Sequence, residues 1–245
     1  MRIVSWNCNG GLKKKLDAML ALEPDIAVIQ ECSRRDLEAS GATTVAWTGR
    51  NPHRGLGIAA FGCTSIVIRD DSESETPWYL TASIHRGALH LLGLWATVHQ
   101  GPQRYVRVAH DIVDRCTEFL AVDHAIAIGD FNSNAIWDAR YRGHSHTDLV
   151  AKFGKIGLTS AYHSTRGEAD GQELTPTHYL YRHRDRPYHL DYGFLSTRLM
   201  PSATFTIGDP AEWLKWSDHM PLVVDIDLPK SRTDLAMDFD KDFAD

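Results

Sequence analysis

Polar side chains that can do chemistry follow the apolar segments of this sequence, at points where buried strands would end. The segment 125–134, AIAIGDFNSN, places Asp130 and Asn132 directly after a short apolar run. Two residues apart, these side chains lie on the same side of an extended chain, and Phe131 points away into packing. An aspartate that stands alone after a strand is usually a turn residue. Here the pattern recurs along the chain, which gives it weight.

The other segments of this kind end in, or lie beside, amide, carboxylate and imidazole groups. They are Asn7 and Asn9 after RIVSW, Glu31 after DIAVIQ, His99 after LLGLWATV, Asp191 after YHL, and Asp218 with His219 before MPLVVDI. Strand ends on one side of an α/β sheet converge in space, where ligands bind. Carboxylates gathered there repel one another unless a cation or protons occupy the cluster. These residues are therefore candidates for one shared site.

The residue types limit the chemistry of such a site. Oxygen ligands without cysteines suit a hard cation, Mg²⁺ first and Mn²⁺ or Ca²⁺ next. A zinc site would need a tighter set of histidines and cysteines. A hard cation beside an aspartate and histidines suits attack by water on a phosphoester, because the cation neutralises developing charge while a side chain takes the proton. Asp191 with His219 is the usual kind of pair that orients an imidazole.

The elements that must position these residues are mostly strands. Segments rich in β-branched and aromatic residues predict strands at 2–6, 25–30, 55–62, 64–69, 78–85, 88–99, 124–129, 188–196, 203–207 and 222–226. Helical spacing of apolar residues predicts helices at 103–121, 12–22 and 146–157. Thr147 is the expected N-cap of the last of these.

Strand pairs of hairpin type alternate with strand–helix–strand passages, which predicts an α/β protein with mixed sheets. No linker, repeat or low-complexity block divides the chain, so one domain is expected over 1–228. The tail, 229–245, has three basic against five acidic side chains and few apolar ones. It is expected to be acidic and flexible.

Composition sets broad limits on function. The formal net charge of −6 gives no sign of a strongly basic nucleic-acid binder, although bound cations would change the local field. The four cysteines form no CxxC pair, and buried free thiols are expected. The sequence opens on a strand and turn without a leader-like segment, and no apolar run approaches the ~18 residues of a membrane span. These features predict a cytoplasmic protein without a membrane partner.

An ordered set of motifs then resembles a known family. SWNCNG, IQECS, TVHQG, IGDFNSN, HLDYGF and SDHMPL, in this order, resemble the endonuclease/exonuclease/phosphatase superfamily, and the match runs from Trp6 to Leu222. Its members include pancreatic-type deoxyribonucleases, apurinic endonucleases, neutral sphingomyelinases and inositol polyphosphate 5-phosphatases. The resemblance implies a four-layer α/β/β/α sandwich with two facing mixed sheets flanked by helices, and a site between the ends of the sheets.

The resemblance also implies which residues would hold the cation. Glu31 matches the principal metal ligand, and Asn7 matches the asparagine that supports that glutamate and the phosphate. Asp218 resembles a second carboxylate near the cation. Asn9 stands where some members carry an aspartate, which makes it a further candidate ligand. Mg²⁺ is the implied cofactor, with Mn²⁺ as a substitute.

Catalytic roles follow by the same route. Asp130 and Asn132 resemble the pair that aligns the water and holds the phosphate. His219 resembles the imidazole beside the scissile phosphate, with Asp191 as its orienting carboxylate; either Asp130 or His219 can accept the proton of water. His99 stands where apurinic endonucleases carry a tyrosine and where deoxyribonuclease-like and sphingomyelinase-like members carry a histidine. A histidine there can protonate the leaving group, which argues against specialised abasic-site repair.

The expected function is hydrolysis of a phosphodiester, most often in nucleic acid. Arg104, which follows His99, and the arginines of 181–189 are candidate contacts for phosphates. The alternatives are a hydrolase of a small phosphoester, such as a nucleotide, sugar phosphate or lipid headgroup, and a catalytically silent binding protein on the same fold. DNA or RNA, endo- or exo-cleavage, one cation or two, and the oligomeric state are open at this stage.

Overall fold

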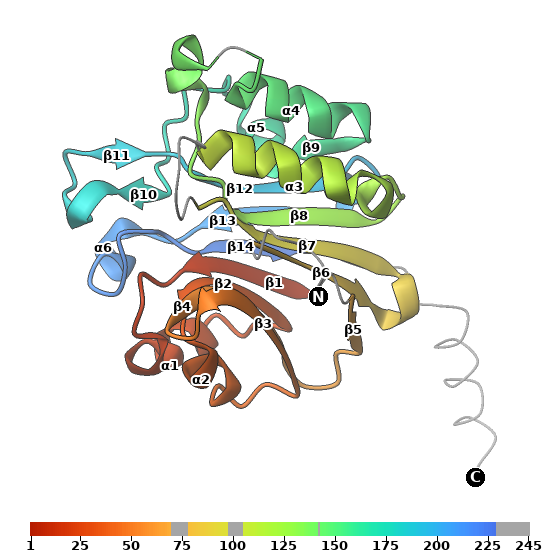
Figure 1. Ribbon diagram of the computed structural model, residues 1–245, viewed down its shortest axis with the longest axis vertical. Helices are drawn as coiled ribbons and strands as arrows, with labels where there is room; N and C mark the ends of the chain where they lie inside the picture. Colours follow the sequence, from red (N-terminus) through yellow and green to blue (C-terminus); the bar gives the residue numbers. More distant parts are fainter. Residues whose placement is uncertain (70–77, 98–104, 142, 229–245) are drawn as a thin grey trace.

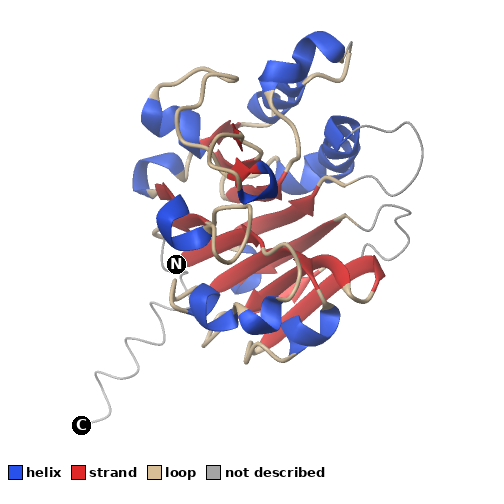
Figure 2. Cartoon of the chain, turned by 90° about the vertical axis from the view of Figure 1, so that its left-hand side faces the viewer, coloured by secondary structure: helices blue, strands red, loops and turns tan. Residues whose placement is uncertain are grey.

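The computed structural model describes residues 1–69, 78–97, 105–141 and 143–228. Two six-stranded β-sheets face each other, and helices cover the outer face of each sheet (Figure 1). Figure 2 shows the same arrangement after a turn of 90°, with the helices placed around the strands. The predicted four-layer α/β/β/α sandwich is therefore confirmed. The predicted tail, 229–245, lies outside the described residues.

The first sheet joins N-terminal strands to C-terminal ones. Its order is β13-β14-β1-β2-β4-β3. The strands are β1 (Arg2–Asn7), β2 (Ile26–Cys32), β3 (Thr44–Asn51), β4 (Arg54–Ala60), β13 (Thr204–Ile207) and β14 (Leu222–Asp225). β1 and β2 pair in parallel, and the other neighbours pair in antiparallel fashion. The C-terminal ends of β1 and β2 therefore meet at the same edge of this sheet.

The second sheet has the order β5-β6-β7-β8-β12-β9, and β7 and β8 are its parallel pair. Its strands are β5 (Ile66–Ile68), β6 (Tyr79–Ile84), β7 (Leu89–Trp95), β8 (Ala125–Asp130), β9 (Leu158–Ser160) and β12 (Asp191–Ser196). β8 and β12 run antiparallel, with Asp130 opposite Asp191. A short separate hairpin consists of β10 (His178–Tyr179) and β11 (Pro187–Tyr188).

Helices form the two outer layers. The α-helices of the described chain are α1 (Leu16–Leu20), α2 (Arg34–Glu38), α3 (Tyr105–Leu120), α4 (His146–Lys155), α5 (Ala161–Arg166) and α6 (Pro210–Trp213). The 3₁₀ turns are Leu12–Lys14, His85–Gly87, Ala135–Arg140, Leu180–Arg182 and Met200–Ser202. α1 and α2 lie outside the first sheet, and α3, α4 and α5 lie outside the second (Figure 1). Among the described residues, no helix has the length and apolar character needed to cross a membrane.

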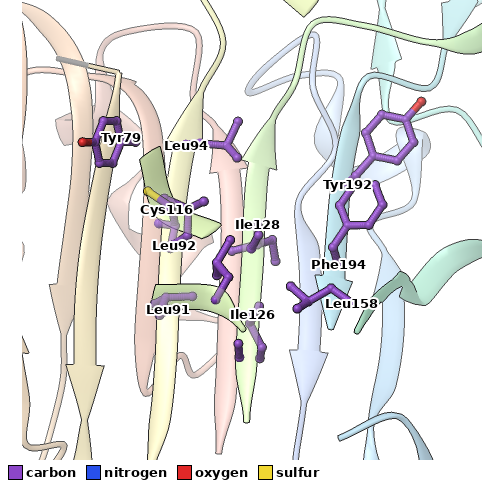
Figure 3. Packing of buried hydrophobic residues seen from close by; sticks show 14 of the residues in the cluster. Tyr79, Leu91, Leu92, Leu94, Cys116, Ile126, Ile128, Leu158, Tyr192 and Phe194 are labelled. Carbon is purple, nitrogen blue, oxygen red and sulfur yellow. The ribbon is translucent and has the colours of Figure 1, made fainter. Parts of the chain in front are cut away.

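The core fills the space between the sheets and the space beneath the helices (Figure 3). Every residue of β8 is buried, because the strand contacts β1 and β2 on one face and α3 on the other. Strands covered on both faces are almost continuously apolar, which explains the run at 125–128. Gly93 of β7 lets the sheets approach closely, since an added Cβ would lie 2.7 Å from Val28 Cγ1.

The structure corrects the predicted elements in places. The helix expected at 12–22 is divided into a 3₁₀ turn and α1, because Lys15 has non-helical φ and ψ of −122° and −1°. Ser145, not Thr147, is the N-cap of α4: Ser145 Oγ accepts a hydrogen bond from Asp148 N at 3.0 Å. The Thr147 hydroxyl instead donates to Asp138 Oδ2 at 2.6 Å.

The thiols follow the prediction with one exception. All four cysteines are free, and Cys8, Cys32 and Cys116 are buried. Cys63 is exposed, because it lies in the turn between β4 and β5 and not in a strand. Burial raises the pKa of the Cys8 thiol to about 12, so that this group is an inert thiol at neutral pH.

Candidate active site

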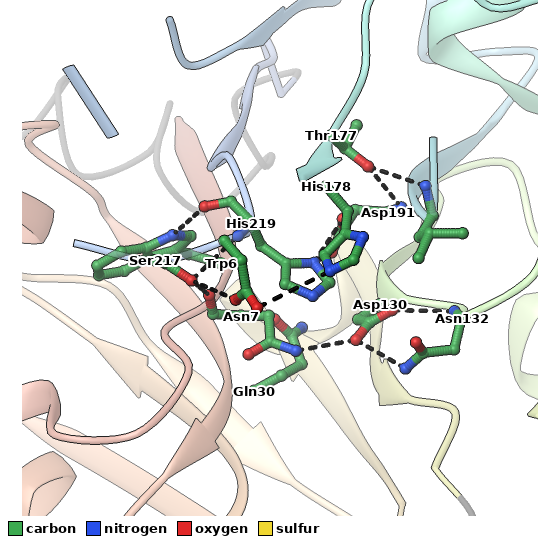
Figure 4. A network of polar contacts seen from close by, with 12 residues as sticks. Trp6, Asn7, Gln30, Asp130, Asn132, Thr177, His178, Asp191, Ser217 and His219 are labelled. Carbon is green, nitrogen blue, oxygen red and sulfur yellow. Dashed lines mark hydrogen bonds and ion pairs between the residues drawn. The ribbon is translucent and has the colours of Figure 1, made fainter. Parts of the chain in front are cut away.

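Polar side chains from both sheets meet at one end of the sandwich (Figure 4). Asn7 ends β1, and Glu31 lies near the end of β2, its parallel neighbour. Asp130 ends β8 and Asp191 begins β12, opposite it in the register. Asn7 links the two sheets, because its Nδ2 donates to Asp130 Oδ2 at 2.9 Å and to Glu31 Oε1 at 3.2 Å. The structure thus brings together strand ends that are far apart in the sequence.

Asp130 is fully buried and held by its neighbour two residues on. The backbone N–H of Asn132 donates to Asp130 Oδ1 at 2.9 Å, and Asn132 Nδ2 donates to Asp130 Oδ2, also at 2.9 Å. A further bond from Asn132 Nδ2 to the carbonyl of Ala96 anchors the amide on the end of the second sheet. Phe131 points the other way into the core, as expected from the alternation of an extended chain.

The environment of Asp130 sets its protonation. Complete burial, together with the charges of Asp191 and Glu31, raises the pKa of Asp130 to about 7. The charge of His219 and the hydrogen bond from Asn7 oppose this shift. Desolvation disfavours the charged form of any carboxyl, and nearby carboxylates add to that effect. Asp130 can therefore exchange a proton near neutral pH.

His219 and Asp191 form a buried pair beside Asp130. Nδ1 of His219 lies 2.9 Å and 3.1 Å from the two carboxylate oxygens of Asp191. The backbone on both sides is fixed: Asp191 N donates to Thr177 Oγ1 at 3.0 Å, and His219 N donates to Ser217 Oγ at 3.1 Å. Trp6 Nε1 donates to the carbonyl of His219 at 3.0 Å. The imidazole is thereby held in one place.

The charge of this imidazole is decided by its carboxylate neighbours. Burial lowers the pKa of His219, but the charges of Asp191 and Asp130 outweigh burial and raise it to about 10. One ligand atom from each of these three residues lies within 4.8 Å of the others. His219 is therefore a protonated, positively charged donor at neutral pH.

An irregular backbone conformation orients the side chain of Glu31. The register between β2 and β4 shifts between Gln30 and Cys32, so Glu31 is the extra residue of a bulge. Its φ of +61° lies in the left-handed region, which is strained for a residue other than glycine. Asn7 donates to Oε1, and Arg54 Nη2 forms an ion pair with Oε2 at 2.5 Å.

Asp218 and Asn9 lie on the other side of this group. Asn9 Nδ2 donates to Asp218 Oδ1 at 2.8 Å, and the Asn9 N–H donates to Asn7 Oδ1 at 3.0 Å. Asn9 and Asn132 share the left-handed backbone of Glu31, with φ of +49° and +47°. Strained residues of this kind gather at functional sites, where the surrounding structure must hold them.

The donor set suits a hard cation. Four carboxylates gather here, those of Glu31, Asp130, Asp191 and Asp218. Burial is the main cause that raises the pKa of Asp130, and the charges of Asp191 and Glu31 add to it. Carboxylate and amide oxygens are the ligands that Mg²⁺ and Mn²⁺ prefer. The assignment of Glu31, Asp218 and Asn9 as the ligands stays a prediction.

Sequence reasoning missed two residues of this group. His178 of β10 is 8% exposed, and its ring centroid lies 4.4 Å from that of His219. Burial and the charge of His219 lower the pKa of His178 to about 4, so the ring is neutral. A two-residue strand leaves no apolar pattern that could reveal it. Arg54 directly precedes the predicted strand at 55–62 and belongs to none of the motifs, and its contact with Glu31 identifies it.

The structure does not bring all of the predicted residues into this group. His99 and Arg104 lie outside the described residues. The arginines of 181–189 are exposed, and Arg182 donates to the carbonyls of Lys215 and Trp216 at 3.2 Å. That bonding indicates that Arg182 fixes the β10–β11 hairpin to the segment before Asp218.

Comparison with known proteins identifies the fold. No protein-family model matches the chain, and no curated protein matches it. The solved 3′–5′ exonuclease NExo from Neisseria meningitidis is similar, with a TM-score of 0.68, 19% identity, and coverage of 93% of this chain and 100% of that one. The AP endonuclease from Archaeoglobus fulgidus is similar with a TM-score of 0.65, 19% identity, and coverage of 93% and 99%.

A third similar structure is the AP endonuclease LMAP from Leishmania major, with a TM-score of 0.67, 16% identity, and coverage of 93% of this chain and 88% of that one. At these identities the likeness shows the architecture. The chain has the exonuclease and AP endonuclease fold, as the resemblance of its motifs predicted.

Proposed function

We propose that this chain is a Mg²⁺-dependent phosphodiesterase that cleaves nucleic acid by attack of water on phosphorus. The observation that carries the proposal is the meeting of Asp130 with the Asp191–His219 pair, across two sheets joined by Asn7. The known proteins with this fold support a nucleic-acid substrate. They include an exonuclease and AP endonucleases, and NExo was also solved, as a 3′ phosphatase, with a product DNA hairpin.

Asp130 is the group proposed to take the proton from water. A general base works best when its pKa is close to the working pH, and burial brings the pKa of Asp130 to about 7. Asn132 holds both carboxylate oxygens through its N–H and its side-chain amide. The carboxylate is therefore oriented before substrate arrives.

His219 is the group proposed to face the phosphoryl oxygens. Its raised pKa keeps it protonated, so it places a positive donor where negative charge develops. Asp191 orients the ring through Nδ1, which leaves Nε2 to contact substrate. Asn7, whose amide donates to Asp130 and Glu31, would hold these two carboxylates in position from the first sheet.

The cation would be held by Glu31 and Asp218, with the side-chain oxygen of Asn9 beside them. When bound, it would neutralise charge on the phosphate and lower the pKa of the attacking water. Arg54 now pairs with Glu31 and would share that carboxylate with the cation. We further propose that residues 1–228 form one catalytic domain, that His99 assists the leaving group, and that Arg104 contacts phosphate.

Replacing Glu31 by alanine is expected to weaken Mn²⁺ binding by about tenfold or more, because it removes a charged ligand from the proposed cation site. Titration calorimetry or electron paramagnetic resonance of bound Mn²⁺ measures this without any substrate. Glu38→Ala is the matched control, since Glu38 is an exposed glutamate paired with Arg34 on α2. An unchanged Mn²⁺ affinity in Glu31→Ala would remove Glu31 from the ligands.

The pKa of Asp130 predicts a pH profile. A carboxyl with a pKa of about 7 is protonated, and inactive as a base, below that pH. The single-turnover rate at saturating Mg²⁺ should therefore rise about tenfold per pH unit below pH 7 and level off above it. The fall above pH 10, where His219 loses its proton, should be separate. A rate that stays flat from pH 5.5 to 8.5 would exclude Asp130 as the base.

A substrate panel tests the proposal as a whole. The purified chain is offered single- and double-stranded DNA, RNA, abasic DNA, a nucleotide monoester and a chromogenic phosphodiester, with Mg²⁺, Mn²⁺ or EDTA. Cleavage of polymer that stops with EDTA is the expected result. Preference for the monoester would favour the second candidate, a small-phosphoester hydrolase, which the net charge of −6 and the 3′ phosphatase neighbour support. Activity that persists with EDTA would refute the proposed dependence on a divalent cation.

A further inference from the structure

A cavity of about 450 Å³ adjoins the proposed catalytic group. Glu31 and Asn132 line its inner side, and the rest of its wall is outside the predicted site. The remaining lining residues are Arg50, Asn51, Arg54, Trp78, Trp95, Thr97 and Tyr105. Asp191 and His219 do not line it. The cavity therefore lies beside the proposed position of the reacting phosphate, which is between Asp130 and His219.

Two arginines face this cavity from the β3–β4 hairpin. Arg50 and Arg54 are both exposed, and each places its guanidinium over the face of a tryptophan. The distances from the guanidinium carbon to the ring centroid are 5.9 Å for Arg50 over Trp78 and 5.7 Å for Arg54 over Trp95. Cation–π packing holds such groups in place without using their N–H donors.

The tryptophans serve as a platform for the arginines. Trp78 and Trp95 are each 5% exposed, and their rings meet edge to face at 5.5 Å. Buried rings that are covered by guanidinium groups have little open face for a nucleobase. The exposed aromatic side chain on the cavity wall is Tyr105, which is 44% exposed. The inner part of the cavity is therefore built to offer cationic donors, not to stack bases.

The two arginines differ in their partners. Arg54 pairs with Glu31 at 2.5 Å. For Arg50, no carboxylate of the described residues lies within ion-pair distance. A planar guanidinium with open donors matches the paired oxygens of a phosphate. Among the described residues that line the cavity, Arg50 is therefore the guanidinium without a carboxylate partner, and Arg54 connects the cavity to Glu31.

We propose that this cavity, called here the arginine pocket, binds the phosphate one nucleotide away from the phosphate that is cleaved. This inference rests on the proposed function, because it assumes that the reacting phosphate lies between Asp130 and His219. Arg50 and Arg54 would donate to the second phosphate, and Tyr105 would contact the intervening nucleoside at the rim. A substrate with a second phosphate would be selected over one with a single phosphoester.

Small chromogenic diesters that differ by one phosphate test the proposal. The substrates are the p-nitrophenyl diesters of thymidine 5′-phosphate and of thymidine 3′-phosphate, each with and without a terminal phosphate on the other hydroxyl. In one of the two polarities the added phosphate should lower KM about tenfold, as expected for a charge-assisted contact. In Arg50→Ala that advantage should disappear, while hydrolysis of the diester without the added phosphate stays unchanged. Arg50→Lys should restore part of it.

Arg198→Ala is the matched control, since Arg198 is exposed just beyond the end of β12 that lies away from Asp191. An equal KM for both members of each pair in the wild-type protein would overturn the arginine pocket and leave the proposed hydrolase intact. Persistence of the phosphate advantage in Arg50→Ala would also overturn it.

Absence of metal-dependent hydrolysis of every diester would instead refute the proposed function. In that case, the affinities of thymidine 3′,5′-bisphosphate and thymidine 5′-phosphate, measured by calorimetry, test the arginine pocket independently of hydrolysis. Tighter binding of the bisphosphate that is lost in Arg50→Ala would support the pocket. Equal binding of the two nucleotides would overturn it.

Discussion

Replacing Asp130 by asparagine should lower kcat by about three orders of magnitude, the range found when a general base is removed. The amide has nearly the same shape but cannot take a proton from water. It also brings an N–H₂ group toward the donors of Asn7 and Asn132, which now bond the carboxylate. Stopped-flow or quenched single-turnover assays on the substrate chosen by the panel measure the effect.

Two further measurements sharpen this result. Asp123→Asn is the matched control, because Asp123 is exposed just before the opposite end of β8. Its kcat should equal that of the wild-type protein. Mn²⁺ affinity measured on Asp130→Asn separates loss of the base from loss of a ligand, and it should change little. A kcat within tenfold of the wild-type value would contradict the role assigned to Asp130.

Replacing His219 by glutamine should lower kcat by about 10²–10³, the cost of removing one positioned donor to a developing oxyanion. Glutamine can form a hydrogen bond but carries no charge, so the decrease in kcat measures the contribution of the positive charge of the imidazolium. Asp191→Asn should also slow the reaction, because the carboxylate that raises the pKa of His219 is gone. The double variant should be no slower than His219→Gln, since the two residues act as a unit.

His124→Gln provides the control, as His124 lies just before β8 at the end of the sheet away from the site. Additive effects in the double variant would show that Asp191 acts independently of His219. A wild-type rate in His219→Gln would rule out its contact with the reacting phosphate. Thermal unfolding of each variant checks that the buried pair has been changed without loss of the fold.

Much of the fold was predictable because apolar runs report burial directly. The run at 125–128 is apolar since β8 is covered on both faces, and the helical spacing of apolar residues that predicted a helix at 103–121 matches the buried stripe of α3 (Tyr105–Leu120). The half-exposed strand β3 and the two-residue strand β10 escaped, because neither carries a continuous apolar signal. The break at Lys15 depends on local φ and ψ that no periodicity encodes.

For the candidate site, the order of the motifs in the sequence pointed to the candidate residues. The structure added the environment that sets their protonation. The sequence pointed to Asp130 and His219 alike as proton acceptors. The pKa values of both groups are raised, but for different reasons: burial raises that of Asp130 against the charge of His219, whereas the charges of Asp191 and Asp130 raise that of His219 against burial. Asp130 becomes a carboxyl that can exchange a proton near pH 7, and His219 becomes a fixed cation.

The sequence by itself determined which chemical groups this protein has at its strand ends, and these groups indicate the class of cation and the reaction that we propose. Only the tertiary structure decided that Asn7 bridges the two sheets, that His178 lies against His219, and that Arg54 pairs with Glu31. These contacts join residues that are separated by tens to hundreds of positions. Their physical origin is the packing of strands that are distant in the sequence, within the first sheet for Arg54 and Glu31 and between the two sheets for Asn7 and Asp130, which fixes distances and desolvation that no local pattern contains.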